Sequence, residues 1–214
     1  MNLPKPTPIF RFLHIGNLEI CLRREALHAP NHRPKDKLVY KTIHNLDIQR
    51  QRQITPIPCG PAGVIHDYVA FYFGPRSPML LQLHTGRVTG YTERQDPLIY
   101  LVSTAQAVRS SGTGFVFSDG HGIARFTNWF DKLSDLDKVD WDAVYATIWK
   151  DTVDDMDRQR RKQAEFLVHQ QCAWDLIEEI GVLNKAVKKE VEQKLAGFPG
   201  KVRRPVNVRP EWYY

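Results

Sequence analysis

Short apolar runs constrain the fold of this 214-residue chain more than any other feature. The run at 69–73 (VAFYF) ends at a Gly-Pro pair, and similar runs stand at 98–102, 115–117 and 166–168. Continuous apolar runs of this length, bounded by turn residues, are typical of strands that are buried on both faces of a sheet. We therefore expect a β-sheet that is covered by other elements.

Helical patterns separate these runs. Ser77 and Pro78 offer an N-cap followed by proline at the first helical position, so a helix should begin there. Ser103 and Gln106 form a capping box that predicts a second helix start. Further helices are expected at 18–27, 46–53, 141–149, 174–180 and 187–195, and further strands at 9–15 and 181–183. Strands and helices in this irregular order predict an α+β fold.

Composition and patterning predict one domain over residues 1–214. Hydrophobic residues make up 42% of the chain, which is enough for a sizeable core, and no repeat or Gly/Ser linker divides it. Residues 29–63 are polar and proline-rich, which indicates a long surface segment. No stretch reaches the roughly 18 apolar residues of a membrane span, and the first residues lack an apolar signal core. Together with three scattered cysteines, this predicts a cytoplasmic protein with no membrane partner.

The net charge and the absence of common site motifs limit the classes of function that the chain can have. Thirty Lys and Arg residues against 24 Asp and Glu give a net charge of +6, which fits a polyanionic partner but does not require one. The chain has no Gly-x-Gly-x-x-Gly or Walker-type glycine motif, no His-Glu-x-x-His and no Gly-x-Ser-x-Gly. The eight histidines form no pair on an expected helix, so no metal site is predicted.

Two polar placements remain as candidate sites. Glu165 directly precedes the apolar run at 166–168, where burial of its carboxylate would be costly without a compensating partner. A strand-end residue that points to water explains the same position. The segment 49–53 (QRQRQ) could hold phosphates or a base on one helix face, but a solvated helix face explains it equally well.

Several blocks of the sequence together are similar to one known family. They are HIGNL at 14–18, HDYVAFYFGPRSPML at 66–80 and KQAEFLV at 162–168, with shorter blocks at 101–106, 115–119 and 140–141 between them. In this order and spacing they resemble, over nearly the full length, the DarT family of DNA ADP-ribosyltransferases. The resemblance implies the ADP-ribosyltransferase fold: a split mixed β-sheet with flanking helices that binds NAD without a Rossmann glycine loop and without a metal.

The resemblance also implies residue roles. The catalytic glutamate falls on Glu165, and the essential arginine falls on Arg52, or on Arg50 if the preceding loop is gapped. Expected NAD contacts are Arg11, His14, Asn17, Tyr72, Ser77 and Met79. Arg11 departs from a histidine that is frequent in the family, His14 and Asn17 could instead cap the adjoining turn, and Tyr72 and Ser77 could simply pack. Expected contacts to nucleic acid are Arg50, Arg76, Arg158, Arg160, Arg161 and Lys162.

The function that the resemblance implies is that of a bacterial toxin. Such an enzyme transfers ADP-ribose from NAD to a base of single-stranded DNA, here most closely like the thymine branch, and releases nicotinamide. Its partner is a macrodomain antitoxin similar to DarG, which removes the mark. Guanine as acceptor, a noncatalytic single-stranded DNA-binding module, and a protein or RNA acceptor remain as alternatives, because fold does not fix function.

Overall fold

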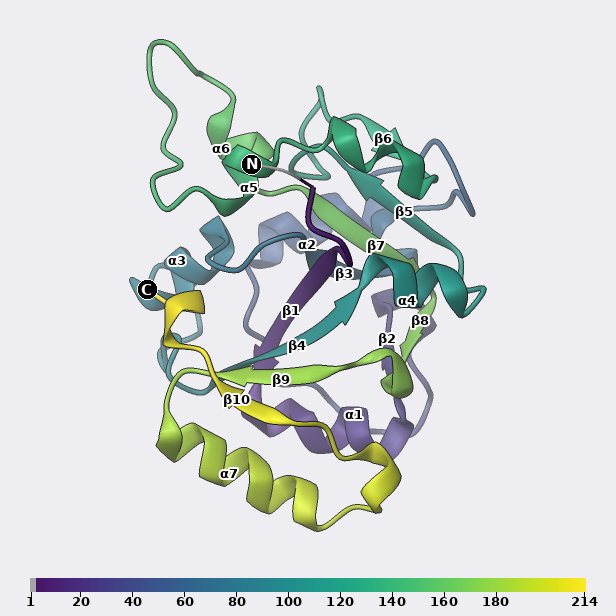
Figure 1. Ribbon diagram of the computed structural model, residues 1–214, viewed down its shortest axis with the longest axis vertical. Coiled ribbons are helices and arrows are strands. Elements are labelled where there is room, and N and C mark those ends of the chain that lie inside the picture. Colours follow the sequence, from purple (N-terminus) through teal and green to yellow (C-terminus); the bar gives the residue numbers. More distant parts are fainter. Residues whose placement is uncertain (1–2) are drawn as a thin grey trace.

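A computed structural model describes residues 3–214 (Figure 1). Within them, an eight-stranded sheet has the order β10-β9-β4-β1-β3-β7-β5-β6. Its strands are β1 (Pro8–His14), β3 (Tyr68–Tyr72), β4 (Leu98–Thr104), β5 (Phe115–Ser118), β6 (Trp129–Phe130), β7 (Glu165–His169), β9 (Glu179–Val182) and β10 (Val206–Val208). β10 runs parallel to β9 and the other neighbours are antiparallel, so the sheet is mixed. β2 (Ala26–His28) and β8 (Gln171–Ala173) pair separately.

Helices flank the sheet. They are α1 (Leu18–Arg24), α2 (Leu46–Ile54), α3 (Pro78–His84), α4 (Ala105–Ser110), α5 (Trp141–Tyr145), α6 (Arg158–Arg161) and α7 (Lys185–Ala196). In Figure 1, α7 and α1 lie together beside the β9–β10 edge, whereas α5 and α6 lie at the opposite end of the molecule. The predicted α+β architecture is confirmed.

The sheet is split between β1 and β3. β1 pairs with β4 along its whole length, and β3 pairs with β7 from Tyr68 to Tyr72, but β1 and β3 share only the pair Phe10 and Tyr72. Beyond that pair the strands separate, and the Nη1 atom of Arg11 donates a hydrogen bond of 2.7 Å to the carbonyl oxygen of Ala70. The predicted split mixed sheet is therefore present, and the split opens a space between two strands.

The packing of side chains follows the same division. One face of the sheet covers a continuous core to which both halves contribute, including Ile9 from β1 and Phe166 from β7. On the other face, Phe12 and its neighbours form one cluster over the β1–β4 half, whereas Tyr68 and Leu167 belong to another over the β3–β7 half. A gap between two small clusters is where a ligand can enter without displacing core side chains.

Local signals predicted several elements correctly. The strands near 9–15, 69–73, 98–102 and 115–117, and the helices α2, α3 and α7, are present. Ser77 caps α3 as expected, because its Oγ accepts a hydrogen bond of 3.2 Å from the backbone N–H of Leu80.

Other elements differ from the prediction. The capping residue of α4 is Thr104 rather than Ser103, which lies within β4. The helix expected at 141–149 ends at Tyr145, and Ile148 is 79% exposed. The helix expected at 18–27 ends at Arg24, because Glu25 takes a left-handed conformation (φ 46°) before β2. A short 3₁₀ turn and β9 occupy 174–182, where a helix was expected up to Ile180; pairing with both β4 and β10 outweighs a three-residue apolar spacing that fits a helix.

Candidate active site

Glu165 and Arg52 form a buried ion pair at the split of the sheet. Glu165 is the first residue of β7, directly across from Tyr72 of β3, and is 2% exposed. Arg52 lies in the last turn of α2. Its Nη1 and Nη2 atoms donate parallel hydrogen bonds of 2.9 and 2.8 Å to Oε1 and Oε2 of the carboxylate. Of the two candidates for the essential arginine, Arg52 and its alternative Arg50, the structure therefore brings Arg52 to the glutamate.

The pair keeps both groups charged. Burial acts to raise the pKa of Glu165, but the charge and hydrogen bonds of Arg52 outweigh burial and leave the pKa below its usual value. Burial likewise acts to lower the pKa of Arg52, and the nearby carboxylate raises it above its usual value. A carboxylate with a lowered pKa is ionised at neutral pH, so the site presents a fixed negative charge.

A third contact comes from the loop between β5 and β6. The backbone N–H of Gly122 donates a hydrogen bond of 3.0 Å to Oε1 of Glu165. A Cβ atom at this glycine would lie 3.1 Å from the same oxygen, which is tighter than most real Cβ contacts, so a glycine suits this close approach. Next to it, burial lowers the pKa of His121, so its imidazole is neutral at pH 7.

The ion pair lies in the wall of a cavity of about 410 Å³. Residues from β1, β3, α2, α3 and the 28–45 segment line this cavity, with Gln159 and Gln163 near Glu165. Within residues 3–214, Glu165 is the one acidic side chain in the lining, whereas Arg11, Arg33 and Arg52 carry positive charge. Burial, with Arg11 and Arg33 nearby, lowers the pKa of His44 to about 4. The cavity is therefore electropositive with a single carboxylate, a balance that suits an anionic ligand.

Three of the expected NAD-contacting residues line this cavity: Arg11, Tyr72 and Met79. The Tyr72 hydroxyl donates to the Met79 sulfur at 3.8 Å, and its ring stacks on Phe12 with a centroid distance of 6.2 Å. Ser77 is buried beneath α3, where it serves as the helix cap, and does not line the cavity.

His14 and Asn17 lie away from the cavity. The Nδ1 atom of His14 accepts a 2.9 Å hydrogen bond from the backbone of Gly16, and its Nε2 lies 3.1 Å from a carboxylate oxygen of Glu93. The Asn17 side chain exchanges two hydrogen bonds, of 2.7 and 2.9 Å, with the backbone of Lys41. Of the two interpretations of these residues, the structural one accounts for their contacts: His14 caps a turn, and Asn17 holds the segment that contains Lys41.

The expected nucleic-acid contacts separate into groups. Arg50 is exposed and pairs only weakly with Asp47, three residues before it, at 3.1 Å. Arg160 and Arg161 are engaged by carboxylates, the first by Asp119 and Asp157 and the second by Asp140 and Asp155. Arg76 donates to the backbone oxygen of Tyr213. Arg158 has a buried Nε with no hydrogen-bond partner among residues 3–214.

The prediction for Lys162 is wrong. The prediction placed it on a DNA-binding surface, but it is only 4% exposed, and its ammonium donates hydrogen bonds of 2.6 and 2.9 Å to the carbonyl oxygens of Val144 and Ala146. The reason is that α5 ends at Tyr145 and leaves carbonyl groups at its C-terminus unsatisfied, and a lysine satisfies them. Lys162 therefore joins α6 to α5.

Sequence reasoning missed several residues that line the cavity or contact Glu165. Arg33 lies in a proline-rich segment that gave no periodic signal, and His121 and Gly122 lie in a loop outside the blocks that carry the resemblance. Gln159 and Gln163 lie in a basic run, 158–163, whose charge pattern gives no sign of a cavity wall. Their place in the cavity wall or beside Glu165 is visible only in the folded chain.

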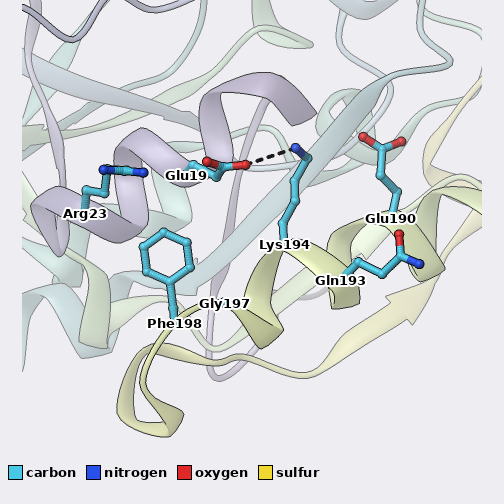
Figure 2. A pocket seen from close by; sticks show the side chains of 7 residues that line it. All are labelled: Glu19, Arg23, Glu190, Gln193, Lys194, Gly197 and Phe198. Carbon is cyan, nitrogen blue, oxygen red and sulfur yellow. Dashed lines mark hydrogen bonds and ion pairs between the residues drawn. The ribbon is translucent and has the colours of Figure 1, made fainter.

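A larger hollow of about 660 Å³ lies elsewhere, between α1 and α7 (Figure 2). Figure 2 shows Lys194 reaching across it to Glu19, an ion pair of 3.2 Å. Its lining mixes both charges and contains none of the groups described above. Although this hollow is larger, the candidate active site is the smaller cavity, because that cavity contains Arg52 and Glu165.

A split mixed sheet with a buried carboxylate at the start of one inner strand, facing an electropositive cavity, is the arrangement of an ADP-ribosyltransferase. The sequence comparison is specific: the family DarT, described as ssDNA thymidine ADP-ribosyltransferase, matches residues 10–214. The chain belongs to the DarT family. It is 43% identical over 211 residues to a DNA ADP-ribosyl transferase of Thermus sp. (strain 2.9), covering 99% of this chain and 98% of that protein. A DNA ADP-ribosyl transferase of Escherichia coli O127:H6 is 32% identical, with 99% and 95% covered.

Solved structures agree. Thermus sp. 2.9 DarT in complex with ADP-ribosylated ssDNA superposes with a TM-score of 0.93 at 41% identity, covering 100% of this chain and 99% of that one. The complex of the same protein with NAD⁺ gives 0.89 at 40% identity, with 100% of both chains covered. Thermosipho africanus DarTG in complex with ADP-ribose is 16% identical with a TM-score of 0.78, covers 97% of this chain and 51% of that one, and shares the fold. Residues 3–214 contain no helix that is long and apolar enough to cross a membrane and no cluster of metal-ligating side chains.

Proposed function

We propose that this protein transfers ADP-ribose from NAD to a thymine base of single-stranded DNA, releases nicotinamide, and acts as the toxin of a toxin–antitoxin pair. The observation that carries the proposal is the Arg52–Glu165 pair at the wall of an electropositive cavity. In the cell we expect a macrodomain antitoxin to remove the mark, and because DNA and NAD meet in the cytoplasm, we place the reaction there. We take the chain to act as one domain.

The cavity fits NAD as the co-substrate. Its volume of about 410 Å³ lies within the range of small-molecule sites, roughly 300–1,000 Å³. Arg11 and Arg33 supply positive charge for the diphosphate, and Tyr72 and Met79 supply an aromatic and a polarisable surface for the nicotinamide end. A relative that is 40% identical over the whole chain has been solved in complex with NAD⁺.

Glu165 serves the first half of the reaction. The bond between the ribose C1′ and the nicotinamide nitrogen breaks, nicotinamide leaves with the bonding electron pair, and positive charge develops on the ribose. A fixed carboxylate that accepts a hydrogen bond from a ribose hydroxyl stabilises this charge electrostatically. The lowered pKa of Glu165 ensures that the carboxylate is ionised before the substrate binds.

The second half joins the base to the sugar. A ring nitrogen of thymine forms the new bond to C1′ and must lose its proton as it does so. After nicotinamide has left, the Glu165 carboxylate accepts that proton. Arg52, charged at all working pH values, donates hydrogen bonds to the base carbonyls and stabilises the developing negative charge. Arg52 and Glu165 are already hydrogen-bonded to each other, so the two side chains need to move little to act on the same base.

Single-stranded DNA suits a cavity of this kind, because an unpaired base can enter it without the cost of opening a duplex. The complex of a 41% identical relative with ADP-ribosylated ssDNA supports this acceptor. Thymine is favoured by the family description, and guanine is the alternative base. A noncatalytic binding module is disfavoured, because pure DNA binding would not need a buried carboxylate in an electropositive cavity.

The test is incubation with NAD and a short single-stranded oligonucleotide pool, followed by nucleoside digestion and mass spectrometry. We expect a gain of one ADP-ribose on thymidine and equimolar release of nicotinamide. Glu165→Ala should remain folded, as judged by circular dichroism, and be inactive. Retardation of DNA on a gel without a mass gain would indicate a binding module, and modified deoxyguanosine would assign the guanine branch. A well-folded and active Glu165→Ala would refute the mechanism.

A further inference from the structure

Tyr214 contacts both ends of α3, the helix that contributes Pro78, Met79 and Gln82 to the cavity. Its hydroxyl donates a hydrogen bond of 2.7 Å to the carbonyl oxygen of Arg76, which stands just before the α3 cap. Its ring lies 6.1 Å from the ring of His84, the last residue of α3. In Figure 1 the end marked C lies beside α3. One side chain thus touches the helix at its start and at its end.

The contact is reciprocal. The Nε atom of Arg76 donates a hydrogen bond of 2.7 Å to the carbonyl oxygen of Tyr213, and its guanidinium lies 5.9 Å from the centre of the Tyr214 ring. Arg76 has a left-handed backbone (φ 53°), a conformation that costs energy in a residue with a side chain and persists only where its surroundings hold it. The Tyr213–Tyr214 pair provides such surroundings.

The segment that holds α3 is itself fixed to the sheet. The Tyr213 hydroxyl lies 3.0 and 3.2 Å from the carbonyl oxygens of Leu98 and Gly181, on β4 and β9. The amide of Gln95 binds Tyr214 on both sides: its Oε1 accepts from the Tyr214 backbone N–H at 3.1 Å, and its Nε2 donates to the Tyr214 carbonyl oxygen. The position of α3 relative to the sheet therefore depends on Tyr214, because its neighbours Tyr213 and Gln95 hold it in place.

Tyr214 also contacts the segment that follows α5. The Nε1 atom of Trp149 donates a hydrogen bond of 3.1 Å to the Tyr214 hydroxyl. Trp149 lies in the segment that joins α5 to α6, and Gln159 on α6 lines the cavity. The hydroxyl thus accepts a hydrogen bond from the segment between α5 and α6 and donates one to the residue that precedes the α3 cap.

We propose that Tyr214 is a positioning residue, which sets the distance between α3 and the 146–157 segment and so shapes the cavity for NAD. The inference rests on the proposed function, since it assigns NAD to this cavity. A helix of seven residues is too short to be stable or well oriented by itself, so α3 depends on its contacts for its position. The Tyr214 contacts described above reach α3 and Trp149 rather than the Arg52–Glu165 pair, so Tyr214 acts through α3.

The variant Tyr214→Phe tests this, because it keeps the ring and removes both hydroxyl hydrogen bonds. The matched control is Tyr213→Phe, which removes a buried tyrosine hydroxyl next to it that binds the sheet rather than α3. NAD affinity is measured by calorimetric titration without DNA, and amide hydrogen exchange is followed over residues 76–84. Steady-state kinetics with the oligonucleotide then separate KM for NAD from kcat.

For Tyr214→Phe we expect NAD affinity to fall and KM for NAD to rise about three- to tenfold, because only part of the effect of losing the two hydroxyl hydrogen bonds reaches the cavity, with kcat within about twofold. Exchange over 76–84 should be faster. Tyr213→Phe should lower the Tm and affect NAD affinity much less than Tyr214→Phe does, because the amide of Gln95 still holds Tyr214. Trp149→Phe, which removes one of the two bonds, should weaken NAD binding less in the same direction and serves if Tyr214→Phe does not fold.

Unchanged NAD affinity and exchange in Tyr214→Phe would overturn the inference, and so would an equal loss of NAD affinity in Tyr213→Phe. Failure of the proposed function looks different. A wild-type protein that binds NAD but modifies no DNA would refute that function while the binding and exchange comparison still tests Tyr214.

Discussion

The guanidinium of Arg52 and the carboxylate of Glu165 come from positions 113 residues apart and meet in two parallel hydrogen bonds, at 2.9 and 2.8 Å. α2 brings the first and β7 the second to the split of the sheet. A carboxylate has about four lone-pair sites, so the pair leaves capacity on Glu165 for the Gly122 N–H and for a ribose hydroxyl. The site is thus assembled and charged before a substrate enters.

The first prediction concerns the energy of this pair. Breaking a buried ion pair leaves an uncompensated charge, so Arg52→Met and Glu165→Met should each lower the free energy of unfolding by about 3–5 kcal/mol. The double variant replaces both charges with apolar groups and should be more stable than either single variant. Urea unfolding at pH 7 measures the free energy of unfolding of the wild type, the two single variants and the double variant. Additive losses in the double variant would show that the two groups do not interact as the structure indicates.

The second prediction concerns the close approach of Gly122. In Gly122→Ala, the added methyl group meets the Glu165 carboxylate, Ile65 and Trp129 at 3.1–3.2 Å, so the carboxylate must shift by a few tenths of an ångström. Since catalytic geometry tolerates little displacement, we expect kcat to fall about tenfold or more while the protein stays folded. Gly200→Ala is the control, because nothing lies within 4 Å of its added carbon. Equal kcat values in the two variants would argue against a precise role for Oε1.

The sequence predicts best what depends on neighbouring residues. The cap at Ser77 and the helix after it need only a few consecutive residues, and both are correct. The segment at 174–180 failed for the opposite reason. Trp174, Ile177 and Ile180 have a spacing that fits a helix, and only the hydrogen bonds of the distant β4 and β10 make the second half of it a strand.

Prediction of the candidate site from sequence is limited in the same way, because its contacts join residues that are far apart along the chain. Residue type and position left Glu165 open between a solvated strand end and a buried group, because its partner is 113 positions away. The charge run at 158–162 suggested a surface for phosphates, but the fold supplies Asp119 to Arg160 and Asp140 to Arg161, and it buries Lys162. Carboxylates that lie far along the chain cannot be assigned to their arginines from composition.

The third prediction concerns Lys162 and pH. Burial, helped by the charge of Arg76, lowers the pKa of Lys162 from 10.5 to about 8. The folded protein then binds this proton less tightly than the unfolded chain, so burying the charged form costs stability below pH 8, and the cost disappears as the pH rises to 10.5. Relative to Lys162→Met, the wild type should gain about 3 kcal/mol of unfolding free energy between these values. A constant difference across this range would mean that Lys162 titrates normally.

The last prediction concerns the salt dependence of DNA binding. Each cation that contacts a phosphate of single-stranded DNA contributes about −0.7 to the slope of log affinity against log salt concentration. Within residues 3–214 no carboxylate pairs with Arg158, whereas Arg161 is held by Asp140 and Asp155. Arg158→Ala should therefore reduce the slope by about 0.7 and Arg161→Ala by less, because its charge is already compensated.

Fluorescence anisotropy of a labelled oligothymidine from 50 to about 300 mM salt measures the slope. Lys162→Met is the matched control: it removes a positive charge of the same run that is buried against Val144 and Ala146, so the slope should not change. If Lys162→Met reduced the slope as much as Arg158→Ala, net charge rather than local contact would control DNA binding. An unaltered slope in Arg158→Ala would place the phosphate track on another face, with the exposed Arg50 as the next residue to substitute.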